Sequence, residues 1–374
     1  MMPTVGLPVV DLFAGAGGFS VASRSAGHDV RLSVEIDPTA CDSLRANDLG
    51  PSHTVFEGDV RNLAGEDLRS LASVQACDPL VVVGGPPCQP FSKASYWTDP
   101  GHDSRFRRAR ARGEDAERPA PITDAKADDR RDLLREFHRL VVESRASAFV
   151  MENVRSLIHP RNRATFNGLV AAFRDAGYHC TVVDANAVSY GVPQKRQRIF
   201  VLGSRVRPPV QPEATHSVAA NGAPALMPPV GVAEVISPFS GDEFFEEGEV
   251  VEGKWARHLE EIPPGWNYKF HTEWAGHPNP TFETETRFWN FLLKLAPGEP
   301  SWTINANPGP WVGPFHWTSR RLRSTEMAAI QTFPAGYVFT GSRRDRVRQI
   351  GNAVPPVLAA KMIKATVATL DGIG

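Results

Sequence analysis

One cysteine, Cys88, stands between the pair Pro86-Pro87 and Pro90, directly after a short apolar run that ends in two glycines. Proline fixes its own φ angle and restrains the residue before it, so this turn leaves the thiol few conformations. A free cysteine is most often a small core residue, but a core has no need of flanking prolines. The pattern favours a covalent nucleophile. Such a thiol needs an electropositive or hydrogen-bonding setting, because an ordinary one is only a few per cent thiolate at neutral pH.

A carboxylate and two arginines are the next candidates for chemistry. Glu152 ends an apolar strand, and the carboxyl end of a strand faces the ligand crevice of an open sheet. Without a partner it would more often be a solvated strand end. Arg196 and Arg198 enter a later strand, where the alternation of side chains puts both on one face. A surface arginine pair usually has no catalytic role, so both interpretations stay open.

A glycine-rich loop, residues 15–18, follows one predicted strand and precedes a helix. This arrangement permits close approach of a ligand to the helix N-terminus. It is not the dinucleotide fingerprint, because Ser20 stands where the last glycine of GxGxxG belongs. Glu35 and Asp59 end the next two predicted strands, where they could accept hydrogen bonds from ribose hydroxyls and from an adenine amino group. The alternative for each carboxylate is a helix cap or a surface position.

The elements that must position these residues alternate between strand and helix, which predicts an α/β fold with a mostly parallel sheet and helices on both faces. The predicted strands are 7–12, 31–36, 53–56, 80–83, 147–151, 178–184 and 198–203. The first helix follows the glycine loop and is closed by Gly27, and the second begins at Asp37-Pro38. Further helices are predicted over 128–143, 164–176, 319–334 and 354–370.

The segment Gly85-Pro-Pro-Cys-Gln-Pro-Phe-Ser92 resembles the catalytic loop of the cytosine-5 DNA methyltransferases. Glu-Asn-Val (152–154), Gln-x-Arg-x-Arg (194–198) and Gly-Asn-Ala-Val-Pro (351–355) are similar to other motifs of that family and follow its usual order. Adenine-N6 and cytosine-N4 methyltransferases place an aromatic residue after Pro-Pro, which is absent here. The resemblance implies a Rossmann-like methyltransferase fold with a smaller, irregular target-recognition domain. It also implies an enzyme that methylates cytosine in DNA.

The resemblance implies roles for the catalytic candidates. Cys88 would add to carbon 6 of a flipped-out cytosine, and Glu152 would hydrogen-bond ring nitrogen 3 and the amino group. Arg198, with Arg196 behind it, would hold the ring oxygen. The implied methyl donor is S-adenosylmethionine, with S-adenosylhomocysteine as product. The positions matched to cofactor binding are Phe13, Ala14, Gly15, Gly17, Gly18, Phe19, Glu35, Ile36, Asp59, Val60, Pro86, Asn352, Ala353 and Val354.

Two of these cofactor positions, Ile36 and Asn352, differ from the family pattern or allow a second interpretation. Ile36 stands where the family often has an aromatic residue, so this position offers no aromatic ring on which adenine could stack. Asn352 could also be a helix N-cap.

Three regions are expected along the chain. Residues 1–205 would form the cofactor-binding and catalytic domain, 206–318 the target-recognition domain, and 319–374 a return segment that completes the first domain. Residues 93–130 hold few large apolar groups and many arginines, and they are interpreted as a mobile active-site loop, with a disordered insertion as the alternative. Seven of the eight tryptophans fall between positions 255 and 317, which favours a second small core.

The 374-residue chain carries a formal net charge of −1, so a phosphate-binding surface must arise from local clustering rather than from the total. Residues 210–318 hold 14 acidic against 5 basic side chains. The phosphate grip is therefore expected from seven arginines between 320 and 348 and from the loop arginines. The first set is Arg320, Arg321, Arg323, Arg343, Arg344, Arg346 and Arg348, and the second is Arg105, Arg107, Arg108, Arg110 and Arg112.

Composition limits the remaining choices. Four cysteines without paired spacing indicate neither a disulfide framework nor a zinc site, and no metal is expected. No window approaches 18 apolar residues and no secretory pattern opens the chain, so the expected location is the cytoplasm, with association to the nucleoid when DNA is bound. Duplex DNA and a companion restriction nuclease are the expected partners of a monomer. The alternatives are the same chemistry on transfer RNA, a catalytically silent DNA-binding module and a nicotinamide oxidoreductase.

Overall fold

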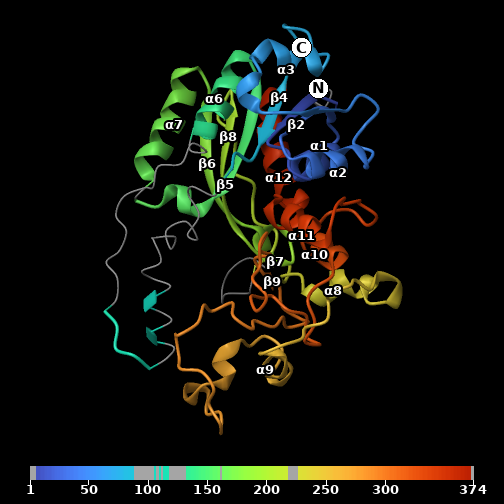
Figure 1. The fold of residues 1–374 in the computed structure, drawn as a ribbon. Helices are drawn as coiled ribbons and strands as arrows, with labels where there is room; N and C mark the ends of the chain where they lie inside the picture. Colours follow the sequence, from blue (N-terminus) through green and yellow to red (C-terminus); the bar gives the residue numbers. More distant parts are fainter. Residues whose placement is uncertain are drawn as a thin grey trace.

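The computed structural model describes residues 6–87, 105–106, 109–110, 113–117, 132–160, 162–217 and 226–371. Its centre is a seven-stranded sheet with helices on both faces, and an irregular lobe lies beyond the carboxyl ends of the strands (Figure 1). The α/β fold and the mostly parallel sheet predicted from the sequence are confirmed.

The sheet is parallel except for one strand, β8, which runs antiparallel to both of its neighbours. In sheet order the strands are β3 (Thr54–Glu57), β2 (Asp29–Glu35), β1 (Pro8–Leu12), β4 (Val81–Gly84), β5 (Ala148–Val154), β8 (Gln197–Ser204) and β6 (His179–Asn186). All seven predicted strands are present, with small shifts at their ends. Strand order reverses between β1 and β4, so their carboxyl ends open a crevice at the place where open sheets bind ligands.

Alternating side chains of β4 show how the sheet is covered. Val82 packs into a core on one face, whereas Val81 and Val83 pack into a core on the other. The first face is covered by α3 (Gly65–Leu71), α6 (Leu133–Glu143) and α7 (Arg163–Asp175), and the second by α1 (Gly18–Ser25) and α12 (Pro356–Val367). The sequence of β4 is a continuous apolar run because the strand is buried on both faces.

Local capping explains where several helices begin and end. Helix α2 (Pro38–Arg45) has Asp37 as N-cap and proline in its first turn, and Gly27 follows α1 with a φ angle of 89°. Both features were predicted. Helix α11 (Arg343–Asn352) was not predicted, although Ser342 and Asp345 form a capping box at its start.

Two predictions about the last helices are wrong. The helix expected over 319–334 is only α10 (Ser324–Ile330), because Ser319 has a φ angle of 69° and Arg321 forms a bridge with Phe315. Asn352 is not the N-cap of α12. It is the last residue of α11, and Pro355 takes the N-cap position of α12.

The second lobe has a small core of its own, formed by Leu259, Ile262, Tyr268, Phe282, Leu292 and Phe315. Its elements are short: α9 (Ala256–Glu261) and the 3-10 turns η8 (Tyr268–His271) and η9 (Glu273–Ala275). The two-residue strand β9 (Ser301–Trp302) pairs with β7 (Gln194–Lys195), which joins the lobe to the catalytic region. Helix α8 (Val232–Ile236) packs instead with α10 and α11 in a separate core. The domain boundaries remain a prediction.

Six of the seven arginines of 320–348 that were predicted to grip phosphate have partners within the chain, and their role toward DNA stays a prediction. They bind acidic groups and backbone carbonyls. Arg323 forms a two-contact pair with Glu249 (2.5 and 3.1 Å), and Glu246 pairs with both Arg343 (3.1 Å) and Arg346 (3.2 Å). Arg320 pairs with Glu326, Arg321 donates to the carbonyls of Gly248 and Val250, and Arg348 pairs with Asp37. Among the seven, Arg344 is exposed. Glu246 and Glu249, two of the acidic residues between positions 242 and 252, are thus paired with arginines of the 319–374 segment.

One stretch in the described part of the chain, Arg343–Leu370, is long and apolar enough to cross a membrane by length and composition, with a mean hydropathy of 1.3. It comprises α11, α12 and a terminal 3-10 turn, and 61% of its most apolar window is buried. Since α12 packs on α1, β5 and β8, this stretch serves as a core helix of the sheet domain.

Candidate active site

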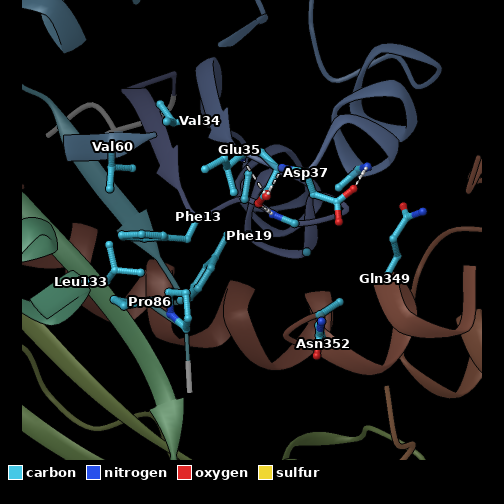
Figure 2. A pocket seen from close by; sticks show the side chains of 18 of the residues that line it. Phe13, Phe19, Val34, Glu35, Asp37, Val60, Pro86, Leu133, Gln349 and Asn352 are labelled. Carbon is cyan, nitrogen blue, oxygen red and sulfur yellow. Dashed lines mark hydrogen bonds between the residues drawn. The ribbon is translucent and has the colours of Figure 1, made fainter. Parts of the chain in front are cut away.

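A cavity of about 420 Å³ lies at the carboxyl ends of β1, β2, β3 and β4 and is closed by α11 (Figure 2). Phe13 and Phe19 lie near its middle, with Glu35 on one side and Asn352 on another. Thirteen of the fourteen residues predicted to bind a cofactor line it: Phe13, Ala14, Gly15, Gly18, Phe19, Glu35, Ile36, Asp59, Val60, Pro86, Asn352, Ala353 and Val354. The structure therefore brings together residues that are up to 341 positions apart (13 to 354) in the sequence.

Gly17 is the exception, because it does not line the cavity. It is the N-cap of α1 with a φ angle of 82°, and a Cβ there would lie 2.7 Å from the hydroxyl of Tyr337 and 2.8 Å from Leu44. Gly18 beside it lies against the carbonyl of Val354, which a Cβ would approach to 2.5 Å. Gly18 thus allows the first helix to pack closely on the last motif of the chain, and Gly17 allows close packing against Tyr337 and Leu44.

Glu35 is oriented by three backbone amides. Its Oε2 accepts a hydrogen bond from Gly15 N at 2.7 Å, and its Oε1 accepts from Ile36 N (2.9 Å) and Asp37 N (2.8 Å). A carboxylate offers about four lone-pair sites, so this one can accept at least one further donor. The carboxylate is fixed at the cavity wall, as a site for hydroxyl groups of a ligand requires.

Another part of the cavity wall is formed by Asp59, Val60 and Ile36. Asp59 caps the 3-10 turn η1 (Val60–Asn62), its Oδ1 accepting from Arg61 N at 2.9 Å, so the capping alternative holds together with the cavity position. Val60 is buried, whereas Ile36 is 62% exposed. This part of the wall offers apolar surface and one carboxylate, a combination that suits a heteroaromatic ring with an amino group.

The sequence reasoning missed ten of the residues that line the cavity, among them Asp37, Arg348 and Gln349. Arg348 and Gln349 come from α11, and Asp37 caps α2. Arg348 pairs with Asp37, and the guanidinium holds the pKa of that carboxyl below its usual range. The capping box that starts α11 is the signal that could have placed Arg348, since it sets which residues of the helix face the cavity.

Ser20 replaces the last glycine of the dinucleotide fingerprint and has a clear role. Its hydroxyl donates to Asp11 Oδ2 at 2.7 Å beneath the glycine loop and contacts the hydroxyl of Ser33 at 3.0 Å. Asp11 is fully buried, and desolvation raises its pKa to about 7. A carboxyl group that is partly protonated at neutral pH therefore supports the loop from below.

Glu152 and Arg198 form the polar centre beside the cavity. Arg198 Nε lies 2.7 Å from Glu152 Oε1, and each side chain is only 13% exposed. On the paired strands Arg198 is opposite Val154, so Glu152 is its diagonal neighbour on the same face. The two residues assigned to the base pocket thus lie in contact, while their roles toward a base remain a prediction.

Strand β5 also contacts the segment that leads to Cys88. Asn153 is buried and its side-chain amide donates to the carbonyl of Pro86 at 3.1 Å. A Cβ on Gly85 would lie 3.3 Å from Glu152 Oε2, so the backbone of this segment passes next to the carboxylate. Cys88 itself lies outside the described residues, as do Arg107, Arg108, Arg112 and most of the 93–130 loop. Its role as nucleophile remains a prediction.

The structure does not place Arg196 behind Arg198. Arg196 is 1% exposed, and its guanidinium donates to the carbonyls of Gly351 (3.0 Å) and Ala353 (2.9 Å). The chain changes course between β7 and β8, so the alternation expected for one continuous strand does not carry through this residue. Arg196 positions the backbone of the last motif rather than the base pocket.

Comparisons with known proteins agree with this arrangement. The model of the C-5 cytosine-specific DNA methylase family matches residues 7–221 and 296–368. The chain is 38% identical over 386 residues to the type II methyltransferase M.SacI of Streptomyces achromogenes, covering 96% of this chain and 92% of that protein. It is 30% identical to the type II methyltransferase M1.HphI of Haemophilus parahaemolyticus, with 96% and 86% covered.

Solved structures show the same fold at lower sequence identity. A candidate DNA modification methyltransferase encoded within an Escherichia coli prophage superposes with a TM-score of 0.62 at 21% identity, covering 98% of this chain and all of that chain. The Dnmt2 methyltransferase of S. pombe gives 0.55 at 13% identity, with 98% and 99% covered. The family match leaves out residues 222–295, which include most of the second lobe. The chain belongs to the C-5 cytosine-specific DNA methylases and is a DNA cytosine methyltransferase.

Proposed function

We propose that this enzyme transfers a methyl group from S-adenosylmethionine to carbon 5 of a cytosine that is flipped out of duplex DNA at a specific sequence. The observation that carries the proposal is the Glu152–Arg198 pair beside the cavity, together with the hydrogen bond by which Asn153, next to Glu152 on β5, holds the carbonyl of Pro86. A carboxylate and a guanidinium side by side match the donor and acceptor edge of cytosine. In the proposed complex one oxygen of Glu152 would accept a hydrogen bond from the amino group and the other would give a proton to ring nitrogen 3, while the guanidinium of Arg198 would donate to the ring oxygen.

The residues of the cavity fit S-adenosylmethionine. The glycine loop permits close approach of the methionine part, the oriented carboxylate of Glu35 suits ribose hydroxyls, and Asp59 with Val60 suits the adenine ring. When bound, this cofactor supplies an activated methyl group on a sulfonium. The apolar surface of Phe13 and Phe19 would exclude water from that group.

In the proposed mechanism the enzyme first makes carbon 5 nucleophilic. The Cys88 thiolate adds to carbon 6 of the ring while the carboxyl group of Glu152 gives a proton to nitrogen 3, and Arg198 donates a hydrogen bond to the ring oxygen, so the negative charge on the ring is offset. Carbon 5 would then take the methyl group from the sulfonium, which would leave as the neutral thioether S-adenosylhomocysteine. Loss of the carbon 5 proton to a base, return of the nitrogen 3 proton to Glu152 and departure of Cys88 as thiolate restore the aromatic ring.

A stacked base cannot reach these groups, so the cytosine would have to leave the helix at a cost of a few kcal/mol. The second lobe is the proposed source of the compensating contacts. Its Trp302 packs against Trp289 at 4.6 Å between ring centroids, and Lys195 lies 4.8 Å above the ring of Trp302. Trp289 and Trp302 are 49% and 37% exposed. Lys195 is three residues from Arg198, so this aromatic and basic surface is a candidate for contacts with the strand around the extruded base.

The relatives named type II methyltransferases support duplex DNA as substrate and a companion restriction nuclease as a functional partner. A monomer in the cytoplasm, associated with the nucleoid through DNA, is consistent with this role. The competing proposal is the same chemistry on transfer RNA. The tryptophan-rich lobe, which would read a duplex sequence, favours DNA.

The proposal is tested by expressing the protein in a host without cytosine-5 methylation and sequencing bisulfite-treated plasmid. We expect protected cytosines at one position of one short recurring sequence. In parallel, purified enzyme with labelled donor should label duplex DNA and leave transfer RNA unlabelled. Label in transfer RNA alone would overturn the choice of substrate, and label in neither would overturn the proposed activity.

A further inference from the structure

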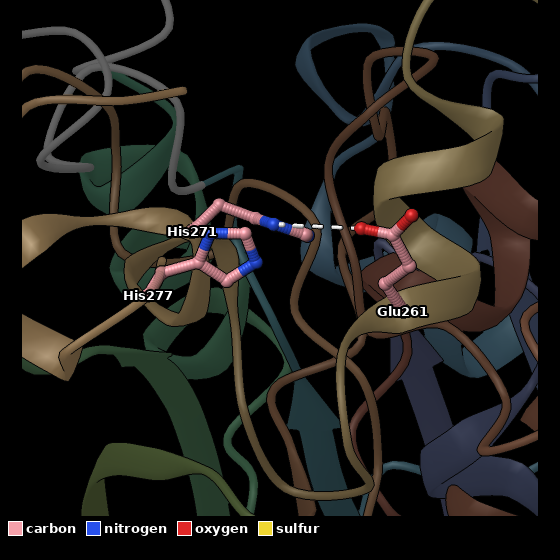
Figure 3. A group of neighbouring side chains, drawn as sticks. All are labelled: Glu261, His271 and His277. Atoms are coloured by element: carbon pink, nitrogen blue, oxygen red, sulfur yellow. Dashed lines mark ion pairs between the residues drawn. The ribbon is translucent and has the colours of Figure 1, made fainter. Parts of the chain in front are cut away.

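Three metal-ligating side chains meet in the second lobe, away from the residues that line the cavity. Glu261 ends α9, His271 ends η8, and His277 follows η9 (Figure 3). Their ligand atoms all lie within 4.8 Å of one another. The side chains come from separate short elements, 10 and 6 residues apart in the sequence (261 to 271, 271 to 277), so only the fold brings them together.

The hydrogen bond of His271 determines which of its nitrogens is available. His271 is 1% exposed, and its Nε2 lies 2.8 Å from the carbonyl oxygen of His258. A carbonyl only accepts, so Nε2 carries the hydrogen and Nδ1 of the neutral ring presents a lone pair. That lone pair faces Glu261 Oε2 at 3.8 Å, as Figure 3 shows. The distance is too long for a hydrogen bond, and both atoms are acceptors, so a proton or a cation is needed between them.

Neutral imidazole is the form that binds metal ions, and the hydrogen bond from Nε2 to the carbonyl of His258 leaves Nδ1 of His271 as the ligand atom that faces Glu261.

His277 offers a second imidazole to the cluster. Its Nδ1 lies 2.8 Å from the carbonyl oxygen of Asn279 and 3.2 Å from the backbone nitrogen of the same residue, and in the tautomer that donates from Nδ1 to this carbonyl Nε2 is the ligand atom. Metal-binding histidines usually donate their second ring nitrogen to a carbonyl or carboxylate, as His271 does. Glu261 is also held in place, since Arg257 binds its other oxygen, Oε1, at 3.1 Å.

We propose that Glu261, His271 and His277 bind one Zn²⁺ ion, with water at the fourth position. Two imidazoles and a carboxylate suit this borderline-soft ion, and bond lengths of about 2.0–2.2 Å require only a modest approach of the three side chains. The ion would join α9 to the 271–277 segment. A lobe built from short helical turns around a six-residue core gains from such a cross-link, because its apolar core is small. The proposal does not depend on the reaction that the first lobe catalyses.

The test uses the full-length chain, freed of metal with a chelator and titrated with ZnCl₂ by calorimetry. We expect a stoichiometry of one ion per chain and a higher thermal unfolding temperature with zinc, whereas MgCl₂ should have no effect. Glu261→Gln and His277→Ala should each weaken zinc binding by about tenfold or more. Glu260→Gln changes the adjacent exposed carboxylate and is the matched control, which should bind as the parent does.

Two outcomes would overturn the proposal. One is the absence of a zinc-dependent heat and unfolding shift in the parent chain. The other is equal zinc affinity in Glu261→Gln and Glu260→Gln. Because Glu261 is exposed, its variant should fold even if a histidine variant does not, and unfolding of the metal-free proteins checks this directly.

Discussion

Glu152 Oε1 and Arg198 Nε lie 2.7 Å apart on two antiparallel strands, next to the backbone of Gly85. The strand pairing puts the two side chains diagonally on one face, so their contact follows from register rather than from flexible surface charges. Both are mostly buried, and each compensates the charge of the other until a substrate takes over part of that role.

Glu152→Gln should lower methyl transfer by about a hundredfold or more, because it removes the carboxyl group that gives a proton to ring nitrogen 3 in the adduct, an effect of the size seen when one such group is lost. Cofactor affinity should change by only a few fold, since Glu35 and the glycine loop are intact. Single-turnover rates and donor titrations measure the two effects. Arg155→Gln is the matched control, because Arg155 forms an exposed pair with Asp184 near the same strand end. A Glu152→Gln variant as active as this control would contradict the assignment.

Asn153→Ala should lower the rate constant for methyl transfer by about tenfold. The amide holds the carbonyl of Pro86, and its loss leaves that buried acceptor unpaired at a cost of about 1–3 kcal/mol. The segment that leads to Cys88 would then be less well positioned. Asn62→Ala changes an exposed asparagine and serves as the control. Unchanged methyl transfer in Asn153→Ala would show that this hydrogen bond does not position the loop.

Glu35→Ala should weaken binding of S-adenosylmethionine by about ten- to a hundredfold, as expected for a lost charge-assisted hydrogen bond. It also removes the acceptor of Gly15 N, so the glycine loop loses a contact. Equilibrium binding of the donor measures the effect in the absence of DNA. Glu57→Ala, an exposed carboxylate on the neighbouring strand, should leave donor affinity unchanged. Equal affinities of the two variants would refute the cofactor role of Glu35.

Asp11 should make the protein less stable as pH rises from about 4 to about 7. Burial raises the pKa of Asp11 to about 7 in the folded chain, whereas the unfolded value is about 3.9. In this window the folded state binds a proton that the unfolded state lacks, so the free energy of unfolding falls with pH and levels off above 7. Three pKa units correspond to about 4 kcal/mol. The free energy of unfolding of Asp11→Asn, measured with urea, should lack this contribution. If it changed with pH between 4 and 7 as much as that of the parent does, the prediction would be contradicted.

Arg323→Ala should destabilise the protein by about 3–5 kcal/mol, because it leaves the buried carboxylate of Glu249 without its partner. Arg344→Ala, on the exposed face of the same region, should stay within about 0.5 kcal/mol of the parent. The paired change Arg323→Met with Glu249→Leu should recover most of the loss. Urea denaturation decides, and equal stability of the two alanine variants would show that the Arg323 pair does not hold the lobe.

Elements with strong local patterns could be predicted from the sequence. The strands are apolar runs that end in glycine or acidic residues, and their parallel order follows from the intervening helices. Because parallel strands deliver their carboxyl ends to one edge, Phe13, Glu35, Asp59 and Pro86 had to meet there. Their grouping in one cavity is now seen, while their roles toward a cofactor stay predictions.

Long-range partners of charged groups could not be predicted. Arg323 and Glu249 are 74 residues apart, and nothing local in either segment indicates that they pair. A cluster of arginines in the sequence therefore suggested a phosphate surface where the fold has ion pairs. Arg196 was misplaced for a related reason, since the break between β7 and β8 depends on pairing with β9 in the second lobe.

The central claim is that Cys88 forms a covalent bond with carbon 6 of a target cytosine. The most direct measurement is the trapping of enzyme on duplex DNA that carries 5-fluorocytosine at the methylated position, in the presence of S-adenosylmethionine. Fluorine cannot leave as a proton does, so the adduct should persist and migrate as a stable complex on a denaturing gel. Cys88→Ala should give no such complex while binding the donor as the parent does. A Cys88→Ala enzyme that still methylates carbon 5 at a comparable rate would contradict the account.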